Sequence, residues 1–217
     1  LNIMVNILFA FLLLIFLLPI YLLIFFFLLF FQGWPIFFYQ KRVGKGFKVF
    51  NLLKYRTMNS DSNGPLVTVK DDPRITFLGK LIRKYKADEL PQLFNILIGN
   101  LNFVGPRPEV PKYVNEQDFY FLNEIKPGLT DFSSILFSNE EKVLLNLGGI
   151  DKYKDILKIK LEVINYYLEV KSPWVDIKIL IFTILSFLVP RLIKKKIKKD
   201  IYKKNPSLYD KITDVGI

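Results

Sequence analysis

The sequence ILFAFLLLIFLLPIYLLIFFFLLFF, residues 7–31, contains no charged and no strongly polar side chain. As a straight helix it would extend roughly 37 Å, enough to cross the hydrocarbon core of a bilayer. Pro19 lies at its midpoint, where the ring removes a backbone hydrogen bond and clashes with the preceding turn. Two structures fit: a kinked transmembrane span, or a helix-break-helix that enters one leaflet and returns. No cleaved signal peptide is expected, because the run is too long and no basic region precedes it.

Basic residues dominate the sequence that follows this apolar run, among them Lys41, Arg42 and Lys45. Lys and Arg collect on the cytoplasmic side of membrane segments, so we expect the body of the protein in the cytoplasm. The net charge of +11 favours an anionic partner, which is a phosphate substrate, an acidic lipid or a nucleic acid.

Two residue types are missing from the sequence, and this narrows the possible chemistry. Without Cys, neither disulfides nor a thiolate zinc site can form. Without His, the commonest general base and the commonest transition-metal ligand are also excluded. Any metal is then expected to be a hard cation bound by oxygen, such as Mg²⁺.

The remaining pattern predicts a small α+β domain that is mostly helical. A β-hairpin is expected from residues 36–43 and 47–55, and a long helix over 151–170. Residues 174–189 are apolar apart from Asp176 and Lys178 and too short to span a bilayer comfortably, so we expect an interfacial helix.

Residues 191–204 carry eight basic side chains and one acidic side chain. They are either a solvated tail or a segment that lies on anionic lipid, and the apolar helix before them favours the lipid.

The heptad Ala87-Asp88-Glu89-Leu90-Pro91-Gln92-Leu93 places two adjacent carboxylates at an expected helix start. Asp88 has two interpretations. It could cap the helix, although Pro91 has no N–H to donate, or it could be an ionised nucleophile that attacks phosphorus. Glu89 could bind a metal or position the second substrate.

Arg107 lies between Pro106 and Pro108, in a stiff segment. Its planar guanidinium could bind a phosphate through two parallel hydrogen bonds, or it could form an ordinary ion pair with Glu109. Arg74 and Arg83 allow the same two interpretations. Three arginines that flank one acidic pair favour phosphate chemistry as a set.

Six ordered motifs together resemble a known family. They are GWPIFFYQKRVG at 33–44, KYRTM at 54–58, DPRIT at 72–76, DELPQL at 88–93, GPRPE at 105–109 and KPGLT at 126–130. From about Leu12 to Phe182 the chain resembles the bacterial sugar transferases called monotopic phosphoglycosyl transferases. These enzymes move a phosphosugar from a UDP-sugar to a polyprenyl phosphate, which starts assembly of a surface glycan.

The resemblance implies a re-entrant helix broken at Pro19, a covalent phosphosugar on Asp88, and Mg²⁺ at Asp88 and Glu89. It implies three segments: a membrane helix-break-helix at 1–32, a catalytic domain at 33–190 and a basic tail at 191–217. The location would be the cytoplasmic face of the bacterial inner membrane. The residues expected to bind substrate are Lys54, Arg56, Arg74, Arg83, Arg107 and Glu109.

The chain departs from the family pattern at several positions. Leu18 replaces the Ser that usually precedes the membrane Pro, and Ile164 aligns where an Asp is common. Asp131 and Phe132 replace Gly-Trp. Before the apolar run only Asn2 and Asn6 stand where charged residues are usual, so we expect an incomplete or altered N-terminus.

We therefore predict an enzyme that transfers a phosphosugar from a UDP-sugar to undecaprenyl phosphate and releases UMP. The membrane is an expected partner and nucleic acid is not. Two other classes fit parts of the sequence. The change at Ile164 would suit a non-catalytic membrane-anchored scaffold of the same fold, and the charge would suit a basic nucleic-acid-binding protein.

Overall fold

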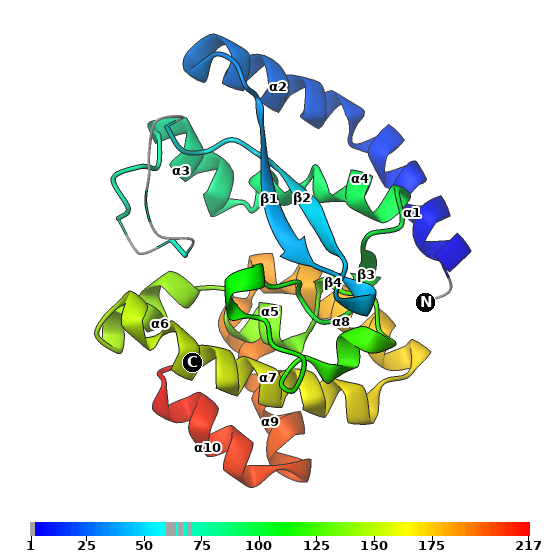
Figure 1. Cartoon of the computed structure of the whole chain (residues 1–217), viewed down its shortest axis with the longest axis vertical. Coiled ribbons are helices and arrows are strands. Elements are labelled where there is room, and N and C mark those ends of the chain that lie inside the picture. The colour runs from blue at the N-terminus through cyan, green and yellow to red at the C-terminus, as the bar shows by residue number, and fades with distance from the viewer. Residues whose placement is uncertain (1–2, 60–63, 65–66, 69–70) are drawn as a thin grey trace.

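A computed structural model describes residues 3–59, 64, 67–68 and 71–217 (Figure 1). The described part is mostly helical, with one antiparallel pair and one parallel pair of short strands. The predicted α+β class is therefore confirmed. The N-terminal helices and the hairpin occupy the upper part of Figure 1, and the helices of the C-terminal half form the lower part.

The predicted break in the apolar run is present. Helices α1 (Ile3–Phe16) and α2 (Leu18–Gln32) are bent by 63° relative to each other. Pro19 lies in the first turn of α2, where its missing N–H leaves no helical hydrogen bond unmade. Within the described residues, no single helix is long and apolar enough to cross a bilayer, but the bent pair together has that length and composition. Re-entry into a membrane stays a prediction.

A polar contact ties α1 to the rest of the protein. The buried Asn6 accepts a 2.9 Å hydrogen bond from the backbone N–H of Phe103 through its side-chain oxygen. Asn2 lies outside the described residues. Asn6, which interrupts the apolar pattern of the sequence, thus fixes where α1 rests on the domain.

The predicted hairpin is confirmed. Strand β1 (Phe37–Val43) pairs antiparallel with β2 (Val49–Tyr55). They are joined by the short helix η1 (Lys45–Phe47), in which Gly46 has a φ of 64° that favours glycine. The hairpin runs from the upper to the lower part of the molecule (Figure 1), and Lys54 is the second-last residue of β2.

Short elements connect the hairpin to the lower helices. They are α3 (Phe77–Lys84), η2 (Ala87–Glu89), α4 (Gln92–Leu97), β3 (Asn102–Val104), η3 (Pro111–Tyr113), η4 (Tyr120–Asn123) and β4 (Gly128–Thr130). Strands β3 and β4 pair in parallel, which we did not predict. They can approach closely because residue 128 is glycine: a Cβ at Gly128 would lie 2.2 Å from the nitrogen of Gly105.

The lower part is helical. It consists of α5 (Phe132–Leu136), α6 (Glu140–Asn146), η5 (Ile150–Lys152), α7 (Tyr153–Val170), α8 (Pro173–Leu188), α9 (Pro190–Lys204) and α10 (Pro206–Asp214). The expected helices near 151–170 and 174–189 correspond to α7 and α8. Ile164 is buried in the hydrophobic core on α7.

The C-terminal residues differ from the expected tail. The basic segment forms α9, and Ile193, Ile197 and Ile201 along it are fully buried in the main core. Leu208 and Ile212 of α10 join the same core. Because isoleucines recur at helical spacing between the lysines, α9 packs one face inward and exposes its basic face.

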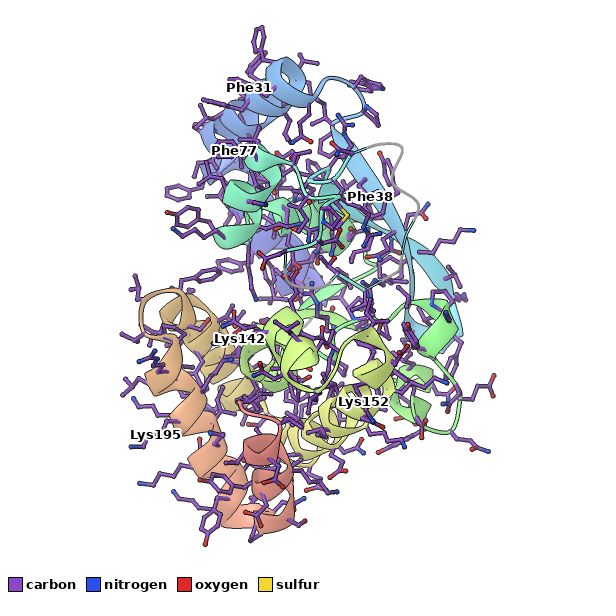
Figure 2. All side chains as sticks on the ribbon, turned by 90° about the vertical axis from the view of Figure 1, so that its left-hand side faces the viewer. Phe31, Phe38, Phe77, Lys142, Lys152 and Lys195 are labelled. Atoms are coloured by element: carbon purple, nitrogen blue, oxygen red, sulfur yellow. The ribbon has the colours of Figure 1, made fainter. Side chains whose placement is uncertain are left out.

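Large apolar side chains are exposed on several helices besides α1, and some of the most exposed lie on α2, α3 and α8. Phe31 of α2, Phe77 of α3 and Leu188 of α8 have relative exposures of 73%, 91% and 77%. Figure 2 shows Phe31 and Phe77 in the upper part of the molecule, with Lys142, Lys152 and Lys195 in the lower part. The N-terminal helix α2 and helix α3 thus expose large apolar side chains in the upper part of the molecule, and α8 exposes others.

Candidate active site

Asp88 and Glu89 lie on a separate turn, not at the start of α4. The turn η2 follows Lys86, whose left-handed backbone (φ 51°) ends the run of α3. Helix α4 begins only after Pro91, and no side chain caps it. The capping interpretation of Asp88 is therefore wrong, because proline delays the helix beyond reach of that carboxylate.

Glu89 is the centre of a charge cluster. Arg107 donates a short hydrogen bond to Glu89 Oε1, and the Nζ of Lys54 lies 3.9 Å from the same oxygen. Burial raises the pKa of Glu89, but Arg107, Lys54 and Lys86 outweigh burial and hold the pKa at about 2. Glu89 is therefore ionised throughout the physiological range.

Asp88 is the more buried carboxyl of the pair, with a relative exposure of 8%. Its pKa is raised, first by burial and second by the negative charge of Glu89, while Lys54 and Arg83 oppose the rise. A carboxylate with a raised pKa is more basic and more nucleophilic than an exposed one. The two neighbouring carboxyls therefore have different properties, as expected where they have different roles.

Lys54 comes from β2 and reaches the cluster from the hairpin. Burial lowers its pKa to about 8, although Glu89 acts in the opposite direction. Lys54 is still mainly protonated at neutral pH. It can therefore stabilise negative charge beside Asp88 and Glu89.

Arg107 and Arg83 approach Asp88 from two different segments. Arg107 also donates to the backbone oxygen of Leu129 at 3.3 Å, which orients the guanidinium toward Glu89. Arg83 donates from Nε to Thr57 Oγ1 at 2.8 Å. Each lowers the pKa of Asp88, so both positive charges act on the carboxyl group. The structure thus brings Lys54 and Arg107 into contact with Glu89, whereas Arg83 pairs with Glu141 at 3.8 Å and acts on Asp88 through its charge.

Glu109 is engaged elsewhere. Its Oε1 accepts hydrogen bonds from Arg42 (3.0 Å) and from the N–H of Val110 (2.8 Å), and its Oε2 accepts from Tyr153 (2.7 Å). All these contacts are buried or partly buried. The geometry favours a positioning role for Glu109 over the expected contact with substrate.

Arg56 and Arg74 also contact other groups. Arg56 donates to the backbone oxygens of Gln32 (2.6 Å) and Gly33 (2.7 Å), at the end of α2. Arg74 forms an ion pair of 2.6 Å with the buried Asp72, which lowers the pKa of Asp72. These contacts secure the end of α2 and the loop before α3, and they do not involve Asp88 or Glu89.

Asp131 stood out in the sequence as a departure from the family pattern, but it was not among the predicted site residues. Asp131 is fully buried and caps α5 by accepting a hydrogen bond of 2.6 Å from the N–H of Ser134. Its other oxygen has no hydrogen-bond partner among the described residues. Burial lowers the pKa of Arg107, but the charge of Glu89 and, to a smaller extent, that of Asp131 raise it. Asp131 therefore helps to keep the guanidinium protonated.

The donor set can be compared with the needs of Mg²⁺. No group of three or more acidic side chains gathers anywhere in the described part of the chain. Mg²⁺ bound together with a phosphate substrate needs only one or two carboxylates, because waters and phosphate oxygens complete its shell. Asp88 and Glu89 supply two carboxylates. Their mutual repulsion, seen in the raised pKa of Asp88, would be relieved by a bound cation. The residues therefore fit Mg²⁺ held jointly with a phosphate ligand.

Comparison with known proteins connects this cluster to a family. The family description "Bacterial sugar transferase" matches residues 1–190. Over 161 residues the chain is 36% identical to the UDP-N-acetylgalactosamine-undecaprenyl-phosphate N-acetylgalactosaminephosphotransferase of Aeromonas hydrophila, covering 71% of this chain and 36% of that protein.

Two further relatives act on other sugars, by their names. The undecaprenyl-phosphate glucose phosphotransferase of Komagataeibacter xylinus is 34% identical over 161 residues, covering 69% of this chain and 29% of that protein. The undecaprenyl-phosphate galactose phosphotransferase of Salmonella typhimurium is 36% identical over 129 residues, covering 50% and 27%. The match thus spans only about a third of the length of these relatives.

The fold and the site thus define a sugar transferase domain with an acidic pair surrounded by cations. The chain belongs to the bacterial sugar transferase family.

Proposed function

We propose that this chain transfers a phosphosugar from a UDP-sugar to a polyprenyl phosphate. The observation that carries the proposal is the pair Asp88 and Glu89, in which one carboxyl has a raised pKa and the other is paired with Arg107. The relatives named above are undecaprenyl-phosphate sugar phosphotransferases by name.

The proposed reaction is a double displacement at phosphorus. An oxygen of Asp88 attacks the β-phosphorus of the UDP-sugar; a phosphorus–oxygen bond to Asp88 forms, the pyrophosphate bond breaks, and UMP leaves. An oxygen of polyprenyl phosphate then attacks the phosphosugar on Asp88. The new pyrophosphate bond forms as the bond to Asp88 breaks, and the carboxylate is regenerated.

The cations around the pair suit this chemistry. Phosphoryl transfer depends mainly on positioning and on stabilising negative charge. Lys54, Arg83 and Arg107 are the candidates to bind the diphosphate. Mg²⁺ bound at Asp88 and Glu89 together with substrate would neutralise further charge on the leaving UMP.

We further propose that the bent helix pair re-enters the membrane and that the domain faces the cytoplasm. Support comes from the 63° bend, from exposed apolar side chains on α2, α3 and α8, and from the basic residues after α2. Exposed Trp174 at the start of α8 is typical of a membrane–water interface. On this proposal the protein lies in the bacterial inner membrane. It would catalyse the first membrane step of glycan assembly.

A panel of UDP-sugars with undecaprenyl phosphate and Mg²⁺, read as UMP release, tests the function. We expect one UDP-sugar to give UMP release that increases when the lipid is added. A non-catalytic scaffold or a nucleic-acid-binding protein would release no UMP with any sugar. Labelled UDP-sugar without lipid should leave its phosphosugar on Asp88.

A further inference from the structure

The buried phenol of Tyr21 connects the bent helix pair to the turn that carries Asp88 and Glu89. Tyr21 lies on α2, and it is the only residue of the apolar run 7–31 whose side chain has a polar atom. Its hydroxyl donates a hydrogen bond of 2.5 Å to the backbone oxygen of Leu90, the residue that follows Glu89. In Figure 1, α2 lies above the hairpin, α3 and α4. An N-terminal helix thus bonds directly to the candidate active site.

Packing directs the Tyr21 hydroxyl toward this turn. The side chain is buried, and its ring centroid lies 6.2 Å from that of Tyr55 and 6.1 Å from that of Phe94 on α4. The hydroxyl of Tyr55 donates to the backbone oxygen of Tyr21 at 3.3 Å. A buried hydroxyl without a partner costs free energy, so the carbonyl of Leu90 helps to determine where α2 rests on the domain.

The turn η2 has few hydrogen bonds of its own. The N–H groups of Glu89 and Leu90 each donate a bond of 3.2 Å to the carbonyl three residues earlier, and such bonds have poorer geometry than those of an α-helix. Neither η2 nor α4 has a side-chain cap among the described residues. The oxygen of Leu90 also accepts a bond of 3.1 Å from the N–H of Leu93. Tyr21 therefore reinforces the turn at the atom that joins it to α4.

Apolar packing connects the same elements. Buried side chains from α2, the hairpin region and α3 form a second small core, which consists of Tyr21, Leu28, Ile36, Tyr55 and Ile82. Ala87 and Leu90, which flank the acidic pair in the sequence, pack against this core. The turn therefore rests on a core that α2 helps to form, in addition to the hydrogen bond from Tyr21.

The far end of α2 is attached to the hairpin. Arg56, which directly follows β2, donates to the backbone oxygens of Gln32 and Gly33 at 2.6 Å and 2.7 Å. Lys54, which contacts Glu89, lies two residues earlier in the chain. Helix α2 is thus bonded near its start to the turn of the acidic pair and at its end to the strand of Lys54.

We propose that Tyr21 is a positioning residue that holds Asp88 in its attacking position through the carbonyl of Leu90. The position of the bent helix pair then sets the geometry of the site. This inference rests on the proposed function and adds a link between its membrane segment and its nucleophile. Tyr21 contacts no reacting atom, so its effect passes through the backbone of the turn. Small displacements of a reacting group have large effects on rate, which makes this link important for the reaction.

The test removes one oxygen atom. Tyr21→Phe keeps the aromatic ring but cannot donate to Leu90. The control is Tyr167→Phe, which removes another buried phenol, one that donates to Asp176 at 2.8 Å. The full chain of each variant is placed in phosphatidylcholine nanodiscs and mixed with the active UDP-sugar and Mg²⁺, without lipid acceptor. The rate constant and the amplitude of the UMP burst are measured against UDP-sugar concentration.

For Tyr21→Phe we expect the maximal burst rate constant to fall about tenfold, with unchanged amplitude and an unchanged half-saturating concentration of UDP-sugar. Affinity should be preserved because Lys54 and Arg107, which are expected to bind the diphosphate, come from other segments. Loss of folded protein alone would lower the amplitude and leave the rate constant as it is. Tyr167→Phe should melt at a lower temperature and keep the wild-type rate constant.

The outcomes separate the two proposals. An unchanged rate constant in Tyr21→Phe, or a decrease that Tyr167→Phe matches, would overturn the positioning role. A higher half-saturating concentration with an unchanged maximal rate constant would assign Tyr21 to substrate binding and also overturn it. Absence of a burst from wild type with every UDP-sugar would contradict the proposed function itself.

Hydrogen exchange tests the link independently of activity. In the same nanodiscs, peptides that cover residues 87–93 should exchange faster in Tyr21→Phe than in wild type, because the hydrogen bonds of the turn open more often. Tyr167→Phe should change exchange in α7 and α8 and leave residues 87–93 as in wild type. Wild-type exchange of residues 87–93 in Tyr21→Phe would show that the turn is held without Tyr21, and it would refute the inference whatever the activity.

Discussion

The phenol of Tyr153 donates a 2.7 Å hydrogen bond to Glu109 Oε2, and this contact joins α7 to the segment that carries Arg107. The other oxygen of Glu109 accepts from Arg42 on β1. Glu109 thus connects the hairpin, the proline-rich segment and the lower helices. The position of the Arg107 guanidinium depends on these buried contacts, although none of them touches Asp88.

Tyr153→Phe should therefore weaken both folding and activity. The substitution leaves a buried charged carboxylate short of one donor, which costs about 1.5–3 kcal/mol of unfolding free energy. Chemical denaturation in detergent would measure it, with Tyr202→Phe at an exposed position as the control. Equal stability of the Tyr153 and Tyr202 variants would show that the hydrogen bond contributes little.

Asp88→Asn should abolish turnover and raise stability. The folded pKa of Asp88 lies above its unfolded value, so its ionisation costs stability as pH rises between these values and this cost persists at pH 7. Asn removes the charge and the cost together, and it also removes the nucleophile. Thermal melting at pH 7 and UMP release would be measured on the same sample. An active Asn variant would exclude Asp88 as the nucleophile.

Lys54→Met should shift the pH dependence of the first half-reaction. Asp88 must be ionised to attack, so activity rises with pH through its pKa. Lys54 lowers that pKa, and its removal should move the acidic limb of kcat/KM to higher pH. Lys48→Met, exposed just before the same strand, is the control. A limb that stays in place would show that Lys54 does not act on Asp88.

Local sequence signals predicted the local structure well. The hairpin was predicted because two strand-like segments flank the turn at residues 44–46, and the break between α1 and α2 because Pro19 interrupts an apolar run. The expected start of α4 was two residues too early. Helical periodicity began at Leu90, but Pro91 moved the actual start to Gln92.

Contacts between distant segments were not predictable from the pattern. Arg56 and Glu109 carry charges in motifs next to phosphate-binding candidates, yet Arg56 closes the end of α2 and Glu109 binds Tyr153 from 44 residues away along the chain. Likewise, the spacing of Ile193, Ile197 and Ile201 could have indicated a packed helix, but the density of lysines around them masked it.

Pro19→Leu should straighten the membrane segment. Leu restores the backbone N–H and removes the ring that disfavours a continuous helix. In the re-entrant arrangement this would move the N-terminus to the opposite side of the membrane. Met4→Cys provides a single label, since the chain has no native Cys and Met4 is exposed. Labelling of Met4→Cys from the periplasmic side in the unmodified Pro19 chain would contradict re-entry.

Arg107→Lys tests whether the shape of this cation matters as well as its charge. Arg107 donates from one nitrogen to Glu89 and from another to the oxygen of Leu129, so its planar group bridges the acidic pair and β4. Lys has the charge but cannot make both contacts from a fixed plane. We expect kcat/KM to fall by the equivalent of about 1.5–3 kcal/mol, roughly ten- to a hundredfold.

The control for Arg107 is Arg191→Lys, at an exposed position on α9. An exposed arginine contributes only about 0–1 kcal/mol, so this variant should have normal kinetics and melting temperature. Arg107→Lys should melt near wild type, because Lys preserves the charge opposite Glu89. If its activity falls only in proportion to a loss of folded protein, then Arg107 supports the structure of the site and does not bind the phosphate.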